Sequence, residues 1–307
     1  MLKSKIKDII GISSDDLLNE VGYRVTESEK EDGYERQLIE FDSYDGKVIA
    51  YLLIPEVSGK SPAILINHQH NGERHLGKSE VCGLAGNPLQ AFGSILAKRG
   101  FVVLAPDSIC FEERRKGGSG TAPLSSYNDF LQHYNEMCYR IIKGETLMKI
   151  VLLDAMNGIT LLSGLPFVNG ENIGTLGHSY GGNIVLFHAA LDSRLKFSCA
   201  SGSACTYHNR MMNYVGIEMA SVIPNFNQKY DIQDLVRCTA PRRLLIVSAE
   251  DDKYSRDADF IVEQAMPAYL EYECGDNLCH MRYSGGHDIT KERLDFIIDW
   301  LLYHTEL

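Results

Sequence analysis

The sequence of 307 residues predicts an α/β fold, with a mostly parallel, doubly wound sheet, helices on both faces and an N-terminal antiparallel hairpin. From residue 61 onward, short apolar runs of strand length alternate with longer helical patterns, which is typical of a parallel sheet covered on both faces. Before that point, two β-rich runs flank Asp45-Gly46, a strong tight-turn signal. We therefore expect one domain that spans residues 1–307.

The expected elements follow one another along the chain. Residues 1–34 form a polar lead-in whose apolar side chains recur at helical spacing, which predicts helix. The hairpin should pair residues 36–41 with residues 47–54. Buried strands are predicted at 63–67, 101–105, 172–176, 197–201, 243–247 and 280–283, and helices at 88–98, 145–162, 180–191, 256–269 and 291–303.

Two segments fit this alternation poorly. They span residues 107–144 and 203–238, and each contains a stretch rich in aromatic side chains. Each follows a predicted strand at the edge of the sheet where α/β proteins bind ligands. We therefore expect these two excursions to line a pocket, and ordinary surface loops packed by their own aromatics are the alternative.

The charge balance argues against a nucleic-acid partner. The chain has 30 Lys and Arg against 41 Asp and Glu, a net charge of −11, whereas phosphate binding relies on clustered cations. The first residues are too charged for a signal peptide, and no later segment approaches the length of a membrane span. We therefore predict a cytoplasmic protein with no membrane partner. The oligomeric state stays open, and a homo-oligomer is compatible with the sequence.

Eight cysteines are scattered along the chain rather than grouped at zinc-ligand spacings. A reducing compartment would keep them as thiols, which is the favoured interpretation. A disulfide between Cys274 and Cys279, the two that lie close together in sequence, is the alternative.

A glycine–serine motif lies where a predicted strand meets a predicted helix. The pentapeptide GHSYG at 177–181 matches the pattern Gly-x-Ser-x-Gly. Such a sharp turn projects the serine hydroxyl above the sheet, and glycines two positions away on each side let strand and helix approach. The pattern predicts Ser179 as a nucleophile. The backbone N–H of Tyr180, at the start of the helix, is the expected first donor to an oxyanion.

One histidine is placed to serve as the base that a serine nucleophile needs. A serine hydroxyl is a weak nucleophile at neutral pH, so a base must lie within hydrogen-bond reach, and an acid must orient that base. Along the chain, the acid and then the base follow a serine on such a turn. His287 lies between the last predicted strand and the last helix, whereas His280 falls inside a strand pattern and His304 at the end of a helix. We predict His287 as the base.

The acid should lie on the loop after the strand predicted at 243–247. Three consecutive carboxylates, those of Glu250, Asp251 and Asp252, stand there. Residue counting alone leaves the choice among them open, because two of the three would belong to a solvated turn that also caps the next helix.

The loop after the strand predicted at 63–67 should supply a second oxyanion donor. The backbone N–H of His70 or of Gln69 is the expected group. His68 and His70 also form a His-x-His pair that could bind a metal, with His75 nearby. The loop lacks the Asp-His continuation of binuclear zinc sites, and serine chemistry needs no metal. We therefore predict neither a metal nor a cofactor.

Taken together, the motifs make the chain similar to a known family: over about residues 35–305 it resembles the dienelactone hydrolase-like and acetyl xylan esterase-like branch of the α/β-hydrolases. Besides the serine turn, the motifs that carry the resemblance are Gly77-Lys78-Ser79-Glu80, Ala105-Pro106-Asp107 with Phe111 and Arg114, Tyr139-Arg140 with Gly144-Glu145-Thr146, Leu191-Asp192-Ser193-Arg194, Ala240-Pro241-Arg242 and Gly286-His287-Asp288. The resemblance implies the α/β-hydrolase fold and a serine esterase without cofactor, acting on a small-acyl or carbohydrate ester. Dienelactone hydrolases proper carry cysteine where Ser179 stands, so a dienelactone is not the expected substrate.

The resemblance also favours one of the three carboxylates. In such hydrolases the acid usually lies three residues beyond the small residue at which the strand leaves the sheet. Counting from Ala249, which stands where the family usually has glycine, gives Asp252. We predict a triad of Ser179, Asp252 and His287, with Asp251 as the alternative acid.

Other functions use the same residues. A thioesterase or a peptidase-like hydrolase would need the same triad and oxyanion donors. A catalytically silent α/β-hydrolase that serves as a binding protein is the alternative outside the enzymes. All three triad candidates are present in the expected order, which argues against a silent protein.

Overall fold

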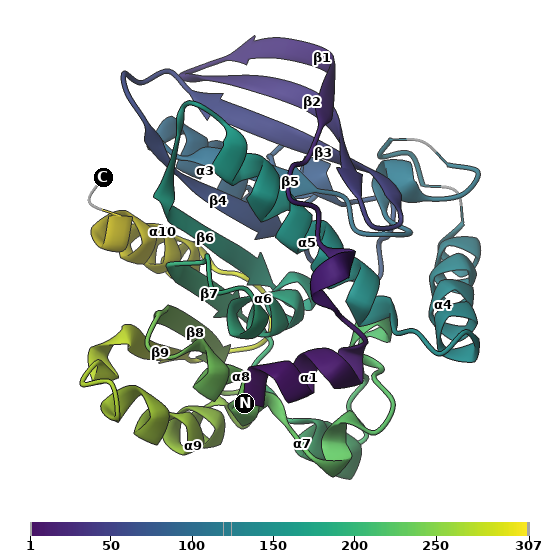
Figure 1. Ribbon diagram of the computed structural model, residues 1–307, viewed down its shortest axis with the longest axis vertical. Coiled ribbons are helices and arrows are strands. Elements are labelled where there is room, and N and C mark those ends of the chain that lie inside the picture. The colour runs from purple at the N-terminus through teal and green to yellow at the C-terminus, as the bar shows by residue number, and fades with distance from the viewer. Residues whose placement is uncertain (1, 119, 124, 306–307) are drawn as a thin grey trace.

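A nine-stranded sheet forms the centre of the computed structural model, which describes residues 2–118, 120–123 and 125–305 (Figure 1). The strand order is β1-β2-β3-β5-β4-β6-β7-β8-β9. The pairs β1–β2, β2–β3 and β3–β5 are antiparallel, and every other neighbouring pair is parallel. The strands are β1 (Tyr23–Glu31), β2 (Tyr34–Ser43), β3 (Gly46–Pro55), β4 (Ser61–Asn67), β5 (Val102–Pro106), β6 (Val168–His178), β7 (Phe197–Ser201), β8 (Arg243–Ala249) and β9 (Leu278–Tyr283). The predicted fold class is confirmed.

Helices cover both faces of the sheet. They are α1 (Leu2–Ile10), α2 (Lys78–Val81), α3 (Phe92–Lys98), α4 (Ser126–Ile142), α5 (Leu147–Gly164), α6 (Tyr180–Leu191), α7 (Tyr207–Met212), α8 (Ile232–Thr239), α9 (Ala258–Leu270) and α10 (Lys291–Thr305). Side chains of a strand alternate between faces, so Leu65 of β4 packs with α5, whereas Ile64 and Ile66 pack with α3 and α10. The face with α5 also carries α1, α6, α8 and α9. Burial on both faces explains why the parallel strands read as nearly continuous apolar runs.

The lead-in is helical only in part. α1 and a short 3-10 turn at Ser14–Asp16 are helical, but the prediction of helix was wrong for residues 23–31, which form β1. β1 pairs with β2 across a turn at Asp32-Gly33, where Gly33 has a φ of 86°. Nearly all side chains of this edge strand are exposed, so its sequence lacks the alternation that marks a half-buried strand. The predicted hairpin is therefore the second half of a three-stranded antiparallel unit.

The helix α5 lies in the core. By length and composition alone, residues Leu147–Gly164 could cross a membrane, with a mean hydropathy of 1.4. The expectation that no segment approaches that length was therefore wrong. In this fold 83% of the same residues are buried inside the protein, and α5 packs against both the sheet and α6. An apolar pattern on all sides of a helix is what such a core position requires.

The two excursions extend from the carboxyl ends of β5 and β7. The first holds a 3-10 turn at Glu112–Arg114 and α4, which stands at the margin of the molecule in Figure 1. The second holds α7, 3-10 turns at Met219–Ser221 and Phe226–Gln228, and α8. Because β5, β6 and β7 run in the same direction, both excursions leave the same edge of the sheet as Ser179, which follows β6.

All eight cysteines are free thiols, so Cys274 and Cys279 form no disulfide. Burial raises the pKa of Cys110 and of Cys205 to about 12. Buried neutral thiols of this kind are unreactive.

Candidate active site

The serine turn lies at the carboxyl end of β6. The strand ends and α6 begins on either side of Ser179, so the predicted strand, turn and helix are confirmed. Ser179 has a φ of 56° and a ψ of −117°, a conformation that residues other than glycine rarely adopt. A Cβ atom on Gly177 would lie 2.3 Å from the carbonyl carbon of Gly181, and one on Gly181 would lie 2.0 Å from the carbonyl oxygen of Asn67. The close approach of β6, α6 and the end of β4 therefore requires both glycines.

Two hydrogen bonds join Ser179, His287 and Asp252, which we call the triad. Ser179 Oγ lies 2.8 Å from His287 Nε2, and His287 Nδ1 lies 3.0 Å from Asp252 Oδ1. A carboxylate can only accept, so Nδ1 carries the proton and donates it to Asp252. Nε2 then has a free lone pair, which accepts the hydroxyl proton of Ser179. This is the geometry of a nucleophile held against a base.

Asp252, rather than Asp251, contacts His287. Asp252 is buried and also accepts hydrogen bonds from the Tyr254 N–H at 2.9 Å and from the Ser255 hydroxyl at 2.7 Å. Burial alone would raise the pKa of Asp252, but the hydrogen bond and charge of His287, together with these donors, hold it below its usual value. The two exposed carboxylates of this loop are those of Glu250 and Asp251.

Two rings pack against the imidazole of His287. The ring centroids of His178 and Tyr254 each lie 4.9 Å from that of His287. Burial lowers the pKa of His178 to about 3, so this neighbour is neutral at pH 7 and does not oppose a positive charge on His287. His178 Nδ1 lies 3.0 Å from Ser201 Oγ, which fixes the ring. Nothing in the sequence pattern indicates a role for either ring, although His178 stands inside the serine motif.

The buried neutral histidines predict a loss of stability in acid. Burial lowers the pKa of His68 to about 4 and that of His178 to about 3, whereas both titrate near 6.5 in the unfolded chain. As the pH falls below 6.5, the unfolded chain binds protons that the folded chain excludes, so the free energy of unfolding decreases. Each of the two histidines should lower the free energy of unfolding by about 2 kcal/mol between pH 7 and pH 5. Urea unfolding at pH 7 and pH 5 measures the loss, and His178→Asn should reduce it by that amount. An equal loss in wild type and variant would contradict this account.

The loop after β4 runs directly against the serine turn. A Cβ atom on Gly181 would lie 2.9 Å from the carbonyl oxygen of His68. Gln69 and His70 follow, and the ring of His70 lies 6.4 Å from that of Tyr180, centroid to centroid. The N–H groups in the first turn of α6, that of Tyr180 among them, have no acceptor within the helix. The assignment of Gln69 or His70 as the second oxyanion donor stays a prediction.

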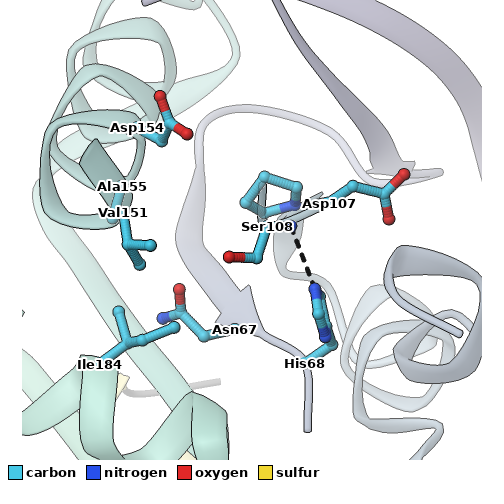
Figure 2. Close-up of a pocket in the computed structure, with 9 residues that line it drawn as sticks. Asn67, His68, Asp107, Ser108, Val151, Asp154, Ala155 and Ile184 are labelled. Atoms are coloured by element: carbon cyan, nitrogen blue, oxygen red, sulfur yellow. Dashed lines mark hydrogen bonds between the residues drawn. The ribbon is translucent and has the colours of Figure 1, made fainter. Parts of the chain in front are cut away.

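Both ring nitrogens of His68 are engaged by the chain. His68 Nε2 accepts the N–H of Ser108 at 3.1 Å, drawn as a dashed line in Figure 2, and Nδ1 therefore donates to the carbonyl of Gln69 at 2.8 Å. His70 Nδ1 faces Glu218 Oε2 at 3.3 Å. These contacts give His68 and His70 partners within the protein, and activity without a metal stays a prediction.

A buried ion cluster lies behind this loop. Lys78 Nζ lies 3.0 Å from Asp107 and 2.5 Å from Glu112, and also binds Glu113. Burial alone would lower the pKa of Lys78, but the carboxylates outweigh it and raise the pKa well above its usual value. Glu112 also accepts two backbone N–H groups of the segment 77–79, at 2.9 and 3.0 Å. The cluster joins the loop after β4 to the loop after β5. It therefore brings the motif Gly77-Lys78-Ser79-Glu80 into contact with Asp107 of the motif Ala105-Pro106-Asp107.

A small cavity lies between the ends of β4 and β5 and the helices α5 and α6 (Figure 2). Its volume of about 20 Å³ suits one water molecule rather than a substrate. Asn67, His68, Asp107, Ser108 and Asp154 are the polar residues among those that line it, and the carboxylate of Asp107 points away from it (Figure 2). A substrate therefore needs a larger space.

A pocket of about 400 Å³ reaches the triad through Tyr254, whose ring packs against that of His287. His70 from the loop after β4 also lines it. The first excursion contributes Ser126 and Phe130 to the wall, and the second contributes residues 216–219. The volume is typical of small-molecule sites, so this pocket is the candidate substrate site.

Arg210 of α7 holds the second excursion against the site. Its Nη1 donates to the carbonyl of Gly216 at 2.9 Å, and its Nη2 donates to Asn183 Oδ1 of α6 at 3.3 Å. Nη2 also lies 3.5 Å from the carbonyl oxygen of Tyr254. One buried guanidinium thus joins the pocket wall, the helix after Ser179 and the loop that carries the acid.

The strand order, the serine turn and the covering helices together define the α/β-hydrolase fold. No family model matches the sequence. The chain is 24% identical over 286 residues to a protein of Bacillus subtilis (strain 168) named "Putative hydrolase YtaP", covering 90% of each chain.

Solved structures show the same fold. The chain matches a "putative acetyl xylan esterase" from Bacteroides fragilis NCTC 9343 with a TM-score of 0.75 and 17% identity, over 92% of this chain and 73% of that one. It matches a glucuronoyl esterase from Solibacter usitatus with a TM-score of 0.69 and 15% identity, over 97% and 91% of the two chains. The resemblance to acetyl xylan esterases is therefore confirmed at the level of the fold.

Proposed function

We propose that this chain is a serine hydrolase that cleaves a carboxylic ester through an acyl-enzyme. The observation that carries the proposal is the hydrogen-bonded chain from Asp252 through His287 to Ser179, placed at the start of α6. A sequence relative named as a hydrolase and fold neighbours named as esterases support it.

The proposed reaction has two halves. Ser179 Oγ attacks the carbonyl carbon of the ester while its proton passes to His287 Nε2, and Asp252 stabilises the resulting imidazolium. The N–H of Tyr180 and a second N–H from the loop after β4 stabilise the oxyanion. The bond to the alcohol then breaks, and His287 protonates the departing oxygen. In the second half His287 takes a proton from water, the water oxygen attacks the acyl carbon, and Ser179 is restored as the acid leaves.

We further propose a small-acyl or carbohydrate ester as the substrate. The pocket beside the triad has apolar side chains in its wall, and the polar side chains of His70, Arg74 and Glu218 lie among them; the apolar ones are those of Phe130, Ile217, Met219 and Tyr254. A wall of this composition suits a hydroxylated or charged ligand better than a long alkyl chain.

Short acyl groups should therefore be preferred. We expect kcat/KM for an acetyl ester to exceed that for an octanoyl ester by about tenfold, because a long alkyl chain would displace water from the charged groups of Arg74 and Glu218 without replacing its hydrogen bonds. A series of p-nitrophenyl esters of increasing acyl length, measured beside acetylated sugars, tests this. A rate maximum at about eight or more acyl carbons would overturn the preference.

A fluorophosphonate probe separates the proposed hydrolase from a silent binding protein of the same fold. Such a probe forms a covalent bond with an activated serine. Labelling of the wild type but not of Ser179→Ala supports the proposal, whereas a wild type that resists labelling favours the binding protein. Thioester and peptide substrates run beside the esters show which acyl compound is cleaved fastest.

A further inference from the structure

Arg74 is a buried cation without an acidic partner. The residue is only 4% exposed, and its Nε donates to His133 Nδ1 at 3.1 Å. Within the part of the chain that the structure describes it forms no ion pair, whereas the equally buried Arg115 binds Asp129 at 3.0 Å. The carboxylates of Glu218 and Asp129 act on Arg74 through their charge alone, without an ion pair. A buried guanidinium that no carboxylate contacts is costly, so a ligand that binds it would offset that cost.

The neighbour that Arg74 does bind cannot balance its charge. His133 is fully buried, and burial holds its pKa well below the usual value, so the imidazole is neutral at pH 7. Burial also lowers the pKa of Arg74, yet a guanidinium keeps its proton at any physiological pH. The positive charge of Arg74 therefore stays in place.

Arg74 belongs to the wall of the pocket beside the triad. Its Cζ lies 5.5 Å from the centroid of the Phe130 ring, and its Nε is held by His133. These contacts fix the plane of the guanidinium. Nη1 and Nη2 have no acceptor among the described residues. These two nitrogens form the fork of a guanidinium, so both can donate to a ligand in the pocket.

One acidic side chain faces the same pocket. Glu218 Oε2 lies 3.3 Å from His70 Nδ1. Burial alone would raise the pKa of Glu218, but the hydrogen bond of His70 and the charges of His70, Arg210 and Arg74 hold it below its usual value. Glu218 is thus ionised and engaged by His70 rather than by Arg74. Because the whole chain carries a net charge of −11, an anion would bind here only through a specific cation.

We propose that Arg74 binds a carboxylate group of the substrate, so that the substrate is an ester with a free carboxylate on its acyl or its alcohol part. The inference rests on the proposed function, since the ester bond must reach Ser179. Tyr254, which packs against His287, and Arg74 line the same pocket, so a small molecule bound there would lie between them. A guanidinium and a carboxylate match each other through two parallel N–H···O bonds.

Two matched ester pairs test the proposal. On the alcohol side, para-acetoxybenzoate is compared with para-acetoxybenzamide, and on the acyl side, mono-p-nitrophenyl adipate is compared with its neutral primary amide. In the wild type the carboxylate member of at least one pair should have the higher kcat/KM, by about 10- to 100-fold. Arg74→Gln should abolish that ratio, and Arg74→Lys should keep only part of it because an ammonium lacks the fork.

Lys60→Gln is the matched control. It removes one positive charge from an exposed residue at the amino end of β4, the edge of the sheet opposite the triad, and should leave the ratio unchanged. A wild-type ratio near one in both pairs would overturn the proposal, as would a ratio that survives Arg74→Gln. If circular dichroism shows that Arg74→Gln does not fold, the test passes to Arg74→Lys. A folded Arg74→Lys that keeps the full wild-type ratio overturns the proposal, and one with a reduced ratio supports it.

Binding measurements on Ser179→Ala separate this proposal from the proposed function. Calorimetry compares para-hydroxybenzoate with para-hydroxybenzamide, and adipate with adipamide. Tighter binding of a carboxylate, lost when Arg74→Gln is added, supports the role of Arg74 even where no ester is hydrolysed. Equal binding of the charged and neutral compounds refutes it even where esters are cleaved.

Discussion

Ser179→Ala should lower kcat for ester hydrolysis by about a million-fold. Ser179 Oγ is the atom that faces His287 Nε2 at 2.8 Å, and no covalent acyl intermediate can form without it. What remains is the contribution of binding and of the backbone donors. The turnover of p-nitrophenyl acetate by purified protein measures the effect. A variant that kept about a tenth of the wild-type kcat would rule out Ser179 as the nucleophile.

Ser203→Ala is the matched control for this prediction. Ser203 lies beside the start of α6, with its Oγ 2.5 Å from where a Cβ on Gly182 would stand. The hydroxyl of Ser203 has no hydrogen-bond partner among the described residues. Removing the hydroxyl oxygen of Ser203 should change kcat by no more than about a few-fold. Alanine is no more strained than serine at the φ of 56° of Ser179, so both variants should show the circular dichroism of the wild type.

The parallel part of the sheet was predictable because its signal is local. β7 and α6 have the bounds that the sequence predicts, since a strand buried on both faces reads as a short apolar run and a helix that follows a glycine turn has a marked start. β1 was missed because an exposed edge strand carries no burial pattern, and its existence depends on pairing with β2.

The three residues proposed as the triad could be chosen from local motifs, and the sequence placed a pocket at the two excursions, but it did not show which side chains form the pocket wall. Ser179 stands in a contiguous motif, and His287 is the histidine on the last loop. Arg74, Phe130 and Glu218 come from three segments that meet only in the folded chain. No local motif singles out any of the three side chains, so contacts that are distant in sequence give them their significance.

Asp252→Asn is expected to have the second large effect, a loss in kcat of up to about ten-thousand-fold. The carboxylate of Asp252 accepts the Nδ1 proton of His287, which leaves Nε2 free to take the proton of Ser179. An amide can instead donate to Nδ1, which places the imidazole proton on Nε2, where it blocks that transfer. The substitution also removes the negative charge that stabilises the imidazolium.

Asp251→Asn and Glu250→Gln are the matched controls, because each removes one negative charge from the same loop. Both side chains are exposed, whereas Asp252 is buried against His287, so these two variants should lose no more than about a few-fold in kcat. An asparagine at 252 can still accept the N–H of Tyr254, so the loop should keep its fold, which circular dichroism checks. Comparing kcat of the three variants at neutral pH tests the assignment. A severe loss in Asp251→Asn beside a nearly normal Asp252→Asn would transfer the role of the acid to Asp251, because only the residue that orients His287 can have the larger effect.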